Sequence, residues 1–229
     1  MLLPHERFLF YGDTANAPYG TKSKEEVLRL SGEIVKKMIA RGCKAVVIAC
    51  NTATSAAAAS LRAKYPSLPI IGMEPALKPA QQLHRDGIVL SLATPGTIAG
   101  EKYAQLYALY GDGVVSLPCP GLMEFAERGE LSGPGLQAYL SRLFSPYAGK
   151  KVEAVVLGCT HYVFLKDAIA RQLPGVPLID GNEGTVRQLR RRLEEKDALA
   201  PEDAPGGAEL LSSGGPEAIA GMERLLKAP

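Results

Sequence analysis

The chain has 229 residues, of which 46% are hydrophobic, so it can bury a substantial core as one large or two small α/β domains. Its 26 basic and 24 acidic residues give a net charge of only +2, and the basic residues are scattered apart from one short run, which argues against a nucleic-acid partner or a membrane surface. No apolar stretch approaches the roughly 20 residues of a membrane span and the amino terminus has no signal pattern, so we expect a cytoplasmic protein.

Short apolar runs alternate with segments of helical period along the chain. We expect strands over residues 8–11, 45–49, 69–72, 88–92, 114–117, 152–157 and 176–179. We expect helices over residues 24–40, 54–64, 97–110, 135–144 and 163–172, then a solvated helix over 185–196 that carries the run Arg190–Arg192, and a final helix over 216–226. The stretches 198–207 and 212–216 have the composition of loops. This order predicts βαβ units in an α/β fold with mainly parallel sheets flanked by helices.

Two of the expected strands are near copies of each other. Residues 45–52 have the sequence AVVIACNT and residues 154–161 have AVVLGCTH. Each copy is a buried strand, a small residue, a cysteine and two polar residues. The repeat predicts two similar α/β domains, which would bring Cys50 and Cys159 together. We place the first domain over residues 1–73 and 183–229 and the second over 74–182.

The repeated cysteines point to proton chemistry. A cysteine between a strand and a helix lies where backbone N–H groups and the helix dipole lower a thiol pKa from about 8.5. Two such thiols suit stereoinversion at carbon, in which a thiolate removes a proton from one face and a thiol delivers one to the other. Asn51, Thr52 and Thr160 follow the cysteines and can stabilise developing negative charge. His161 can orient or assist the thiol of Cys159.

The two remaining cysteines lack such neighbours. We interpret Cys43 as a core residue and Cys119 as a packed loop residue, and we expect all four thiols to be reduced. A zinc site made from Cys43, Cys50, Cys159 and His161 is disfavoured because no spacing among them is typical of zinc. There is no glycine-rich phosphate loop or plausible Schiff-base lysine, so we expect neither metal nor cofactor.

At these residues the sequence closely resembles the glutamate racemase family, and the resemblance runs through almost the whole chain. The segments that carry it are residues 11–15, 18–23, 49–54, 93–97 and 158–162. The resemblance implies an isomerase with two α/β domains and an active site in the cleft between them. It also implies glutamate as substrate, no cofactor, and D-glutamate supplied for peptidoglycan synthesis, hence for cell wall biogenesis and cell shape.

The resemblance also implies roles for individual residues. Cys50 would deprotonate D-glutamate and Cys159 would deprotonate L-glutamate, with His161 as a further catalytic residue. The substrate would be lined by Tyr19, Gly20, Asn51, Thr52, Thr160 and His161, with Thr94 and Thr97 as additional donors. Glu127 matches a family glutamate near the second cysteine, although an exposed helix carboxylate is an equally good interpretation.

One departure from the family concerns the start of the chain. The family opens with a strand and an Asp-Ser-Gly-x-Gly-Gly loop, whose aspartate assists the first cysteine, and this sequence has no such segment. We therefore expect a first domain with an exposed sheet edge and a partly exposed core, and weak or absent racemase activity.

Two other functions remain open at this point. Cys159 with His161 could serve a cysteine-nucleophile hydrolase, for which Cys50 would not matter. A dicarboxylate-binding relic without catalysis would also fit the absent loop. A homodimer is the assembly we consider, although the sequence does not determine it.

Overall fold

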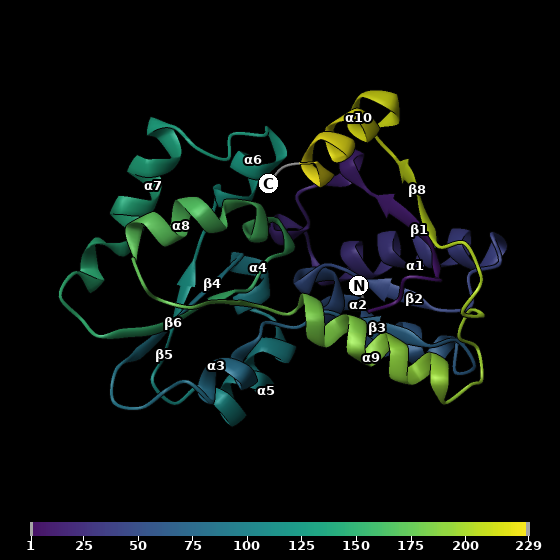
Figure 1. The fold of residues 1–229 in the computed structure, drawn as a ribbon, viewed down its shortest axis with the longest axis horizontal. Coiled ribbons are helices and arrows are strands. Elements are labelled where there is room, and N and C mark those ends of the chain that lie inside the picture. Colours follow the sequence, from purple (N-terminus) through teal and green to yellow (C-terminus); the bar gives the residue numbers. More distant parts are fainter. Residues whose placement is uncertain (1, 228–229) are drawn as a thin grey trace. The chain divides into compact units, whose positions relative to one another are not determined.

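The computed structural model describes residues 2–227 (Figure 1), and within them the chain divides into two compact units. Unit 1 comprises residues 2–73 and 182–227, and unit 2 comprises residues 74–181. The second division falls between Gly181 and Asn182, one residue before the expected boundary.

Unit 2 is built on one parallel sheet of four strands in the order β5-β4-β6-β7. The strands are β4 (Ile88–Ala93), β5 (Val114–Pro118), β6 (Val152–Leu157) and β7 (Leu178–Asp180). All four were predicted from their apolar runs to within two residues. Because both faces of a parallel sheet are covered by helices, its strands can be apolar at every position rather than alternately.

Helices cover both faces of this sheet (Figure 1). On one face lie α6 (Leu122–Glu127), α7 (Pro134–Phe144) and α8 (Lys166–Gln172), and on the other lie α3 (Leu77–Gln81) and α5 (Glu101–Tyr110). Leu90 and Leu92 point into the first layer, whereas Val89, directly before Leu90, points into the second. This alternation buries all three side chains completely.

Two helices of unit 2 differ from their predicted extents. The single helix expected over residues 97–110 is two helices, α4 (Pro95–Ile98) and α5, which are separated by Ala99 and Gly100. Glycine is a poor residue for a helix interior, and here Gly100 precedes the first residue of α5 instead. The helix expected over 163–172 begins as the 3-10 helix η4 (Thr160–Leu165) and continues as α8.

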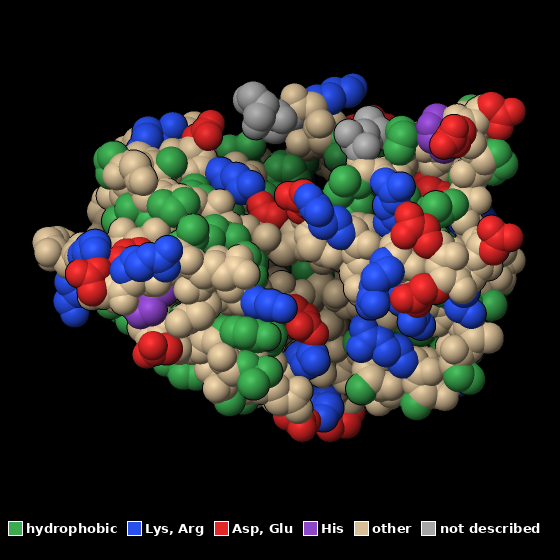
Figure 2. All heavy atoms as spheres, turned by 60° about the horizontal axis from the view of Figure 1, so that its bottom comes forward, with side chains coloured by type: hydrophobic (Ala, Val, Ile, Leu, Met, Phe, Trp, Pro, Cys, Tyr) green, Lys and Arg blue, Asp and Glu red, His purple; other side chains and the backbone are tan. Residues whose placement is uncertain are grey.

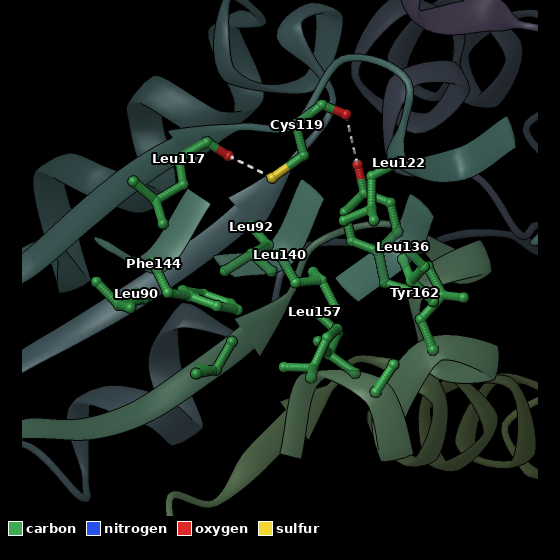
Figure 3. Close-up of a cluster of buried hydrophobic side chains, with 14 of the residues drawn as sticks. Leu90, Leu92, Leu117, Cys119, Leu122, Leu136, Leu140, Phe144, Leu157 and Tyr162 are labelled. Atoms are coloured by element: carbon green, nitrogen blue, oxygen red, sulfur yellow. Dashed lines mark hydrogen bonds between the residues drawn. The ribbon is translucent and has the colours of Figure 1, made fainter. Parts of the chain in front are cut away.

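The core beneath α6, α7 and α8 fixes the start of η4 (Figure 3). Tyr162 is completely buried there, and its hydroxyl donates to the backbone carbonyl of Cys119 at 3.3 Å. The Cys119 thiol donates to the carbonyl of Leu117 at 3.2 Å, and burial raises the pKa of this thiol to about 12. Cys119 is therefore an inert packed residue, as the sequence indicated.

Unit 1 contains two separate parallel sheets of two strands each, β1-β8 and β2-β3. Their strands are β1 (Arg7–Gly12), β2 (Val46–Ile48), β3 (Ile70–Gly72) and β8 (Gly207–Ser212). The strand β8 was missed, because residues 207–212 lack β-branched and aromatic side chains. Its pairing with β1 makes it a strand, which is a tertiary effect that local propensity does not contain.

The helices of unit 1 agree well with the sequence analysis. One core joins α1 (Lys24–Ala40) and α2 (Asn51–Lys64) to the side chains of Val46 and Ile48. On the other face of β2, Val47 packs with α9 (Asn182–Glu194), and α10 (Gly215–Leu226) follows β8. Cys43 packs against the α1–α2 core, as interpreted.

The arginine run lies on α9 as a solvated helix. Arg187, Arg190, Arg191 and Arg192 all pair with glutamates three or four residues away on or next to the same helix. Figure 2 shows basic and acidic side chains interspersed over one face of the molecule. No helix among the described residues is long and apolar enough to cross a bilayer.

Unit 1 leaves strand edges unpaired among the described residues. Gly207 donates its N–H to Glu6 O at 3.2 Å, so alternate residues of β1 bond to β8 while Leu9 and Tyr11 direct their backbone groups to the opposite edge. On β2 the same alternation directs Val47 away from β3. Phe8 and Phe10 on β1 are 42% and 44% exposed, so these side chains are incompletely covered by the described residues.

Candidate active site

The second cysteine stands at the carboxyl end of β6, where Gly158 forces close packing. A Cβ at Gly158 would lie 2.7 Å from the carbonyl oxygen of Leu92 and 3.0 Å from the Cβ of Ala93. The Gly158 N–H donates to that carbonyl at 2.7 Å. Only glycine permits this approach of the strand end to β4, so Cys159 is held firmly at the sheet edge where α/β folds place ligands.

Cys159, His161 and Glu127 form a hydrogen-bonded line in unit 2. The Sγ of Cys159 lies 3.7 Å from His161 Nδ1, and His161 Nε2 lies 2.6 Å from Glu127 Oε1. Cys159 precedes η4, His161 is its second residue and Glu127 is the last residue of α6. The imidazole is 28% exposed and the carboxylate 38%, so a substrate can reach the line from solvent.

The charges along this line place a cation beside Cys159. Burial alone would lower the pKa of His161, but its contacts with Cys159 and Glu127 outweigh burial and raise that pKa to about 10. The hydrogen bond from His161 lowers the pKa of Glu127 against the opposing effect of burial. The pair is therefore an imidazolium and a carboxylate at neutral pH, and the positive imidazolium faces the sulfur.

The first cysteine is stabilised in a different way. Cys50 is the N-cap residue of α2, and its Sγ accepts the backbone N–H of Ala53 at 3.5 Å. The 14-residue helix directs the positive end of its dipole at this sulfur, which favours the thiolate. Asn51 and Thr52 begin the same helix and are buried.

Tyr19 and Gly20 lie in the same unit as Cys50. They begin the short 3-10 helix η2 (Tyr19–Thr21), and Tyr19 and Cys50 both pack against the α1–α2 core. The hydroxyl of Tyr19 donates to the carboxylate of Asp13 at 2.5 Å. Asp13 was not selected from the sequence, although its position directly after β1, at the carboxyl end of a strand, was the available signal.

The three threonines of unit 2 that were predicted to bind substrate lie at the starts of two different helices. Thr160 is the first residue of η4, beside Cys159. Thr94 is the N-cap of α4, where its hydroxyl oxygen accepts the Thr97 N–H at 3.2 Å, and Thr97 is almost fully buried. Capping of α4 gives these two residues a structural role beside the donor role suggested for them.

The structure also bears on disulfide bonds and metal binding by the cysteines. All four lie in the described part of the chain, and none forms a disulfide. Residues 2–227 contain no group of three or more His, Cys, Asp or Glu side chains placed to hold a metal ion.

A cysteine that caps a helix and a cysteine beside an imidazolium are settings typical of enzymes that use thiols for acid–base or nucleophilic chemistry. Residues 2–189 match the family model described as Asp/Glu/Hydantoin racemase. The chain belongs to this racemase family, and because racemases are isomerases, the predicted class of enzyme is confirmed.

Individual relatives extend this match over nearly the whole chain. The glutamate racemase of Clostridium perfringens is 46% identical over 216 residues, which are 93% of this chain and 83% of the relative. The glutamate racemase of Francisella tularensis in complex with D-glutamate aligns with a TM-score of 0.83 at 28% identity, covering 99% of this chain and 86% of that one. The Escherichia coli enzyme in complex with L-glutamate and the activator UDP-MurNAc-Ala aligns with a TM-score of 0.82 at 27% identity, covering 98% and 85%. These structures confirm the predicted α/β fold with parallel sheets flanked by helices.

Proposed function

We propose that this chain interconverts L- and D-glutamate without a cofactor, using Cys50 and Cys159 as the two bases. The observation that carries the proposal is the pair of cysteines at matching strand ends, each with its own means of stabilising a thiolate. The substrate is taken from the relatives, whose names and bound ligands specify glutamate.

The proposed reaction transfers two protons and no other atoms. From L-glutamate, the Cys159 thiolate takes the α-proton and becomes a thiol, which leaves a carbanion. The Cys50 thiol then gives its proton to the opposite face and becomes a thiolate, so D-glutamate is formed. The reverse reaction exchanges the two roles. The mechanism requires both sulfur atoms to reach the same α-carbon, one from each face.

Further residues have supporting roles in this proposal. The His161 imidazolium stabilises the Cys159 thiolate, and Glu127 keeps that imidazole oriented and protonated. Thr160 and His161 are proposed to line the substrate on the Cys159 side. Tyr19, Gly20, Asn51 and Thr52 are proposed to line it on the Cys50 side, where N–H and hydroxyl donors would stabilise the charge of the carbanion.

Single cysteine variants test the proposal most directly. We expect Cys50→Ser and Cys159→Ser each to lose nearly all racemisation in both directions, because a hydroxyl is a far weaker acid than a thiol. Polarimetry or a chiral separation of glutamate measures this. Cys43→Ser is the matched control, since Cys43 packs in the core of unit 1 and should leave turnover unchanged. Racemisation by either site variant within about threefold of the parent would refute the two-base mechanism.

The same variants separate the alternatives. Glu127 supplies the orienting group that a hydrolase based on Cys159 and His161 would need, but membership of the racemase family favours racemisation. A hydrolase would keep its activity in Cys50→Ser, whereas a racemase would not. A protein that only binds dicarboxylates would take up glutamate in calorimetry without racemising it.

The biological setting is proposed on the same basis. D-glutamate from this reaction would supply peptidoglycan synthesis and so sustain cell wall biogenesis and cell shape, which agrees with the muramic acid activator of the E. coli relative. Rescue of a bacterial strain that requires added D-glutamate would test this role. Reduced thiols suit the cytoplasm, which we propose as the location. A homodimer stays a prediction that sedimentation would test.

A further inference from the structure

The carboxylate of Asp13 is held at the carboxyl end of β1 by neighbouring donors. Tyr19 donates its hydroxyl to Oδ2 at 2.5 Å, and Asn16 donates its side-chain N–H to Oδ1 at 2.9 Å. Burial alone would raise the pKa of Asp13, but hydrogen bonds from Tyr19, Asn16 and Ser213 and the charge of Lys37 hold it below its usual range. Asp13 is therefore an anion at neutral pH, and both of its oxygens accept hydrogen bonds.

Tyr19 connects this carboxylate to the first cysteine. Its ring packs against the same core as Cys50, and the short helix η2 that begins at Tyr19 contacts α2, the helix that Cys50 caps. Burial, the hydrogen bond to Asp13 and the nearby charges of Asp13 and Cys50 raise the pKa of Tyr19. The phenol consequently keeps its proton throughout the range in which a thiolate can act.

A tyrosine hydroxyl has one proton to donate, and here Asp13 receives it. Tyr19 therefore cannot give that proton to the Cys50 thiolate or to a substrate carboxylate without losing a short, charge-assisted hydrogen bond. What Tyr19 can offer at the Cys50 side is its ring and the backbone of the Tyr19–Gly20 segment, and the place of that segment depends on the bond to Asp13.

We propose that Asp13 is a positioning residue that anchors Tyr19, and with it the Tyr19–Gly20 backbone, on the Cys50 side of the substrate site. The inference rests on the proposed function, because the Tyr19–Gly20 segment is assigned to the substrate there. Asp13 acts through Tyr19 and takes no part in proton transfer itself. Its loss should therefore weaken substrate binding more than it slows the chemical step.

A double-mutant cycle of Asp13→Ala and Tyr19→Phe tests the anchor. We expect each variant to raise KM for glutamate about tenfold and to lower kcat less than about threefold, since the hydrogen bond to be lost is worth roughly one factor of ten. The double variant should also raise KM about tenfold and not a hundredfold, because both changes remove the same bond. Asp13→Asn keeps an acceptor for the hydroxyl and should restore KM to within about threefold of the parent.

Controls separate positioning from general damage. Asp203→Ala, in an exposed turn of the same unit, should leave both constants unchanged. The melting temperatures of the four cycle proteins should also be non-additive, which tests the Asp13–Tyr19 bond without any activity. Multiplicative effects on KM, an unchanged KM, or a loss confined to kcat would overturn the inference while leaving the proposed function intact. A parent that neither binds nor racemises glutamate would instead overturn the proposed function, and this inference with it.

Discussion

Replacing Glu127 by glutamine removes one charge from the line of Cys159, His161 and Glu127 while keeping its shape. The contact between His161 Nε2 and Glu127 Oε1 is 2.6 Å, which is short for a hydrogen bond from nitrogen. A charged hydrogen bond contributes about 1–1.5 kcal/mol more than a neutral one, which corresponds to about one pKa unit. We therefore expect the pKa of His161 to fall from about 10 to about 9 in Glu127→Gln.

Proton NMR can follow this titration because the chain has only three histidines. Assigning the imidazole signals with His161→Asn and titrating from pH 6 to 11 would give the pKa of His161 in parent and variant. Glu124→Gln, on the same helix but without a bond to His161, is the matched control. A His161 pKa that moves by less than about 0.3 units in Glu127→Gln would refute the reasoning.

The same pair makes stability depend on pH in a defined direction. The pKa of His161 is raised in the folded protein, so its contribution is complete below 6.5 and is lost as pH rises through about 10. The pKa of Glu127 is lowered, so its contribution is complete above 4.5 and is lost as pH falls through the folded value. The gap in unfolding free energy between parent and Glu127→Gln should thus be widest between pH 4.5 and 6.5. Because the pair is about one third exposed and solvent screens it, the gap should lie at the lower end of the range given above, at about 1 kcal/mol.

Three further outcomes are expected from the structure. Gly158→Ala should destabilise the protein by about 1–3 kcal/mol in urea unfolding, because the new methyl group meets Leu92, whereas Gly184→Ala on α9 has open space and should be neutral or stabilising. Leu140→Ala should cost about 2–5 kcal/mol because Leu140 is fully buried, and Leu109→Ala, which is 71% exposed, should change stability by less than about 0.5 kcal/mol. Racemase activity should survive dialysis against a chelator and treatment with a carbonyl reagent, and activity that returned only with a divalent metal or pyridoxal phosphate would contradict the cysteine mechanism.

The sequence predicted those parts of the fold whose signal is local. The strands of unit 2 were found because a sheet covered on both faces makes each strand a largely apolar run, and α1 was placed at its observed bounds from its helical period. The strand β8 was missed because its partner β1 lies at the other end of the chain. Pairing over such a distance leaves no trace in local composition.

In the candidate site, too, the residues with a local sequence signal were selected and those without one were not. The repeated strand and cysteine pattern identified Cys50 and Cys159, and the short spacing in sequence identified His161. The role of Glu127 was left open, because its partner His161 lies 34 residues away and no local sequence pattern distinguishes Glu127 from an ordinary helix carboxylate. Asp13 was passed over because its hydrogen bond to Tyr19 depends on how the loop after β1 folds back.

The pairing of β1 with β8 also determines when unit 1 can be completed during synthesis. Phe8 lies beside Ala208, so β1 pairs with a strand that is synthesised only after the whole of unit 2. Unit 2 consists of one continuous segment and can fold during that interval. Until β8 arrives, β1 has no partner strand among the described residues, and its two phenylalanines are open to chaperones or to neighbouring chains. The yield of native protein should therefore depend on conditions during the interval between the synthesis of β1 and that of β8.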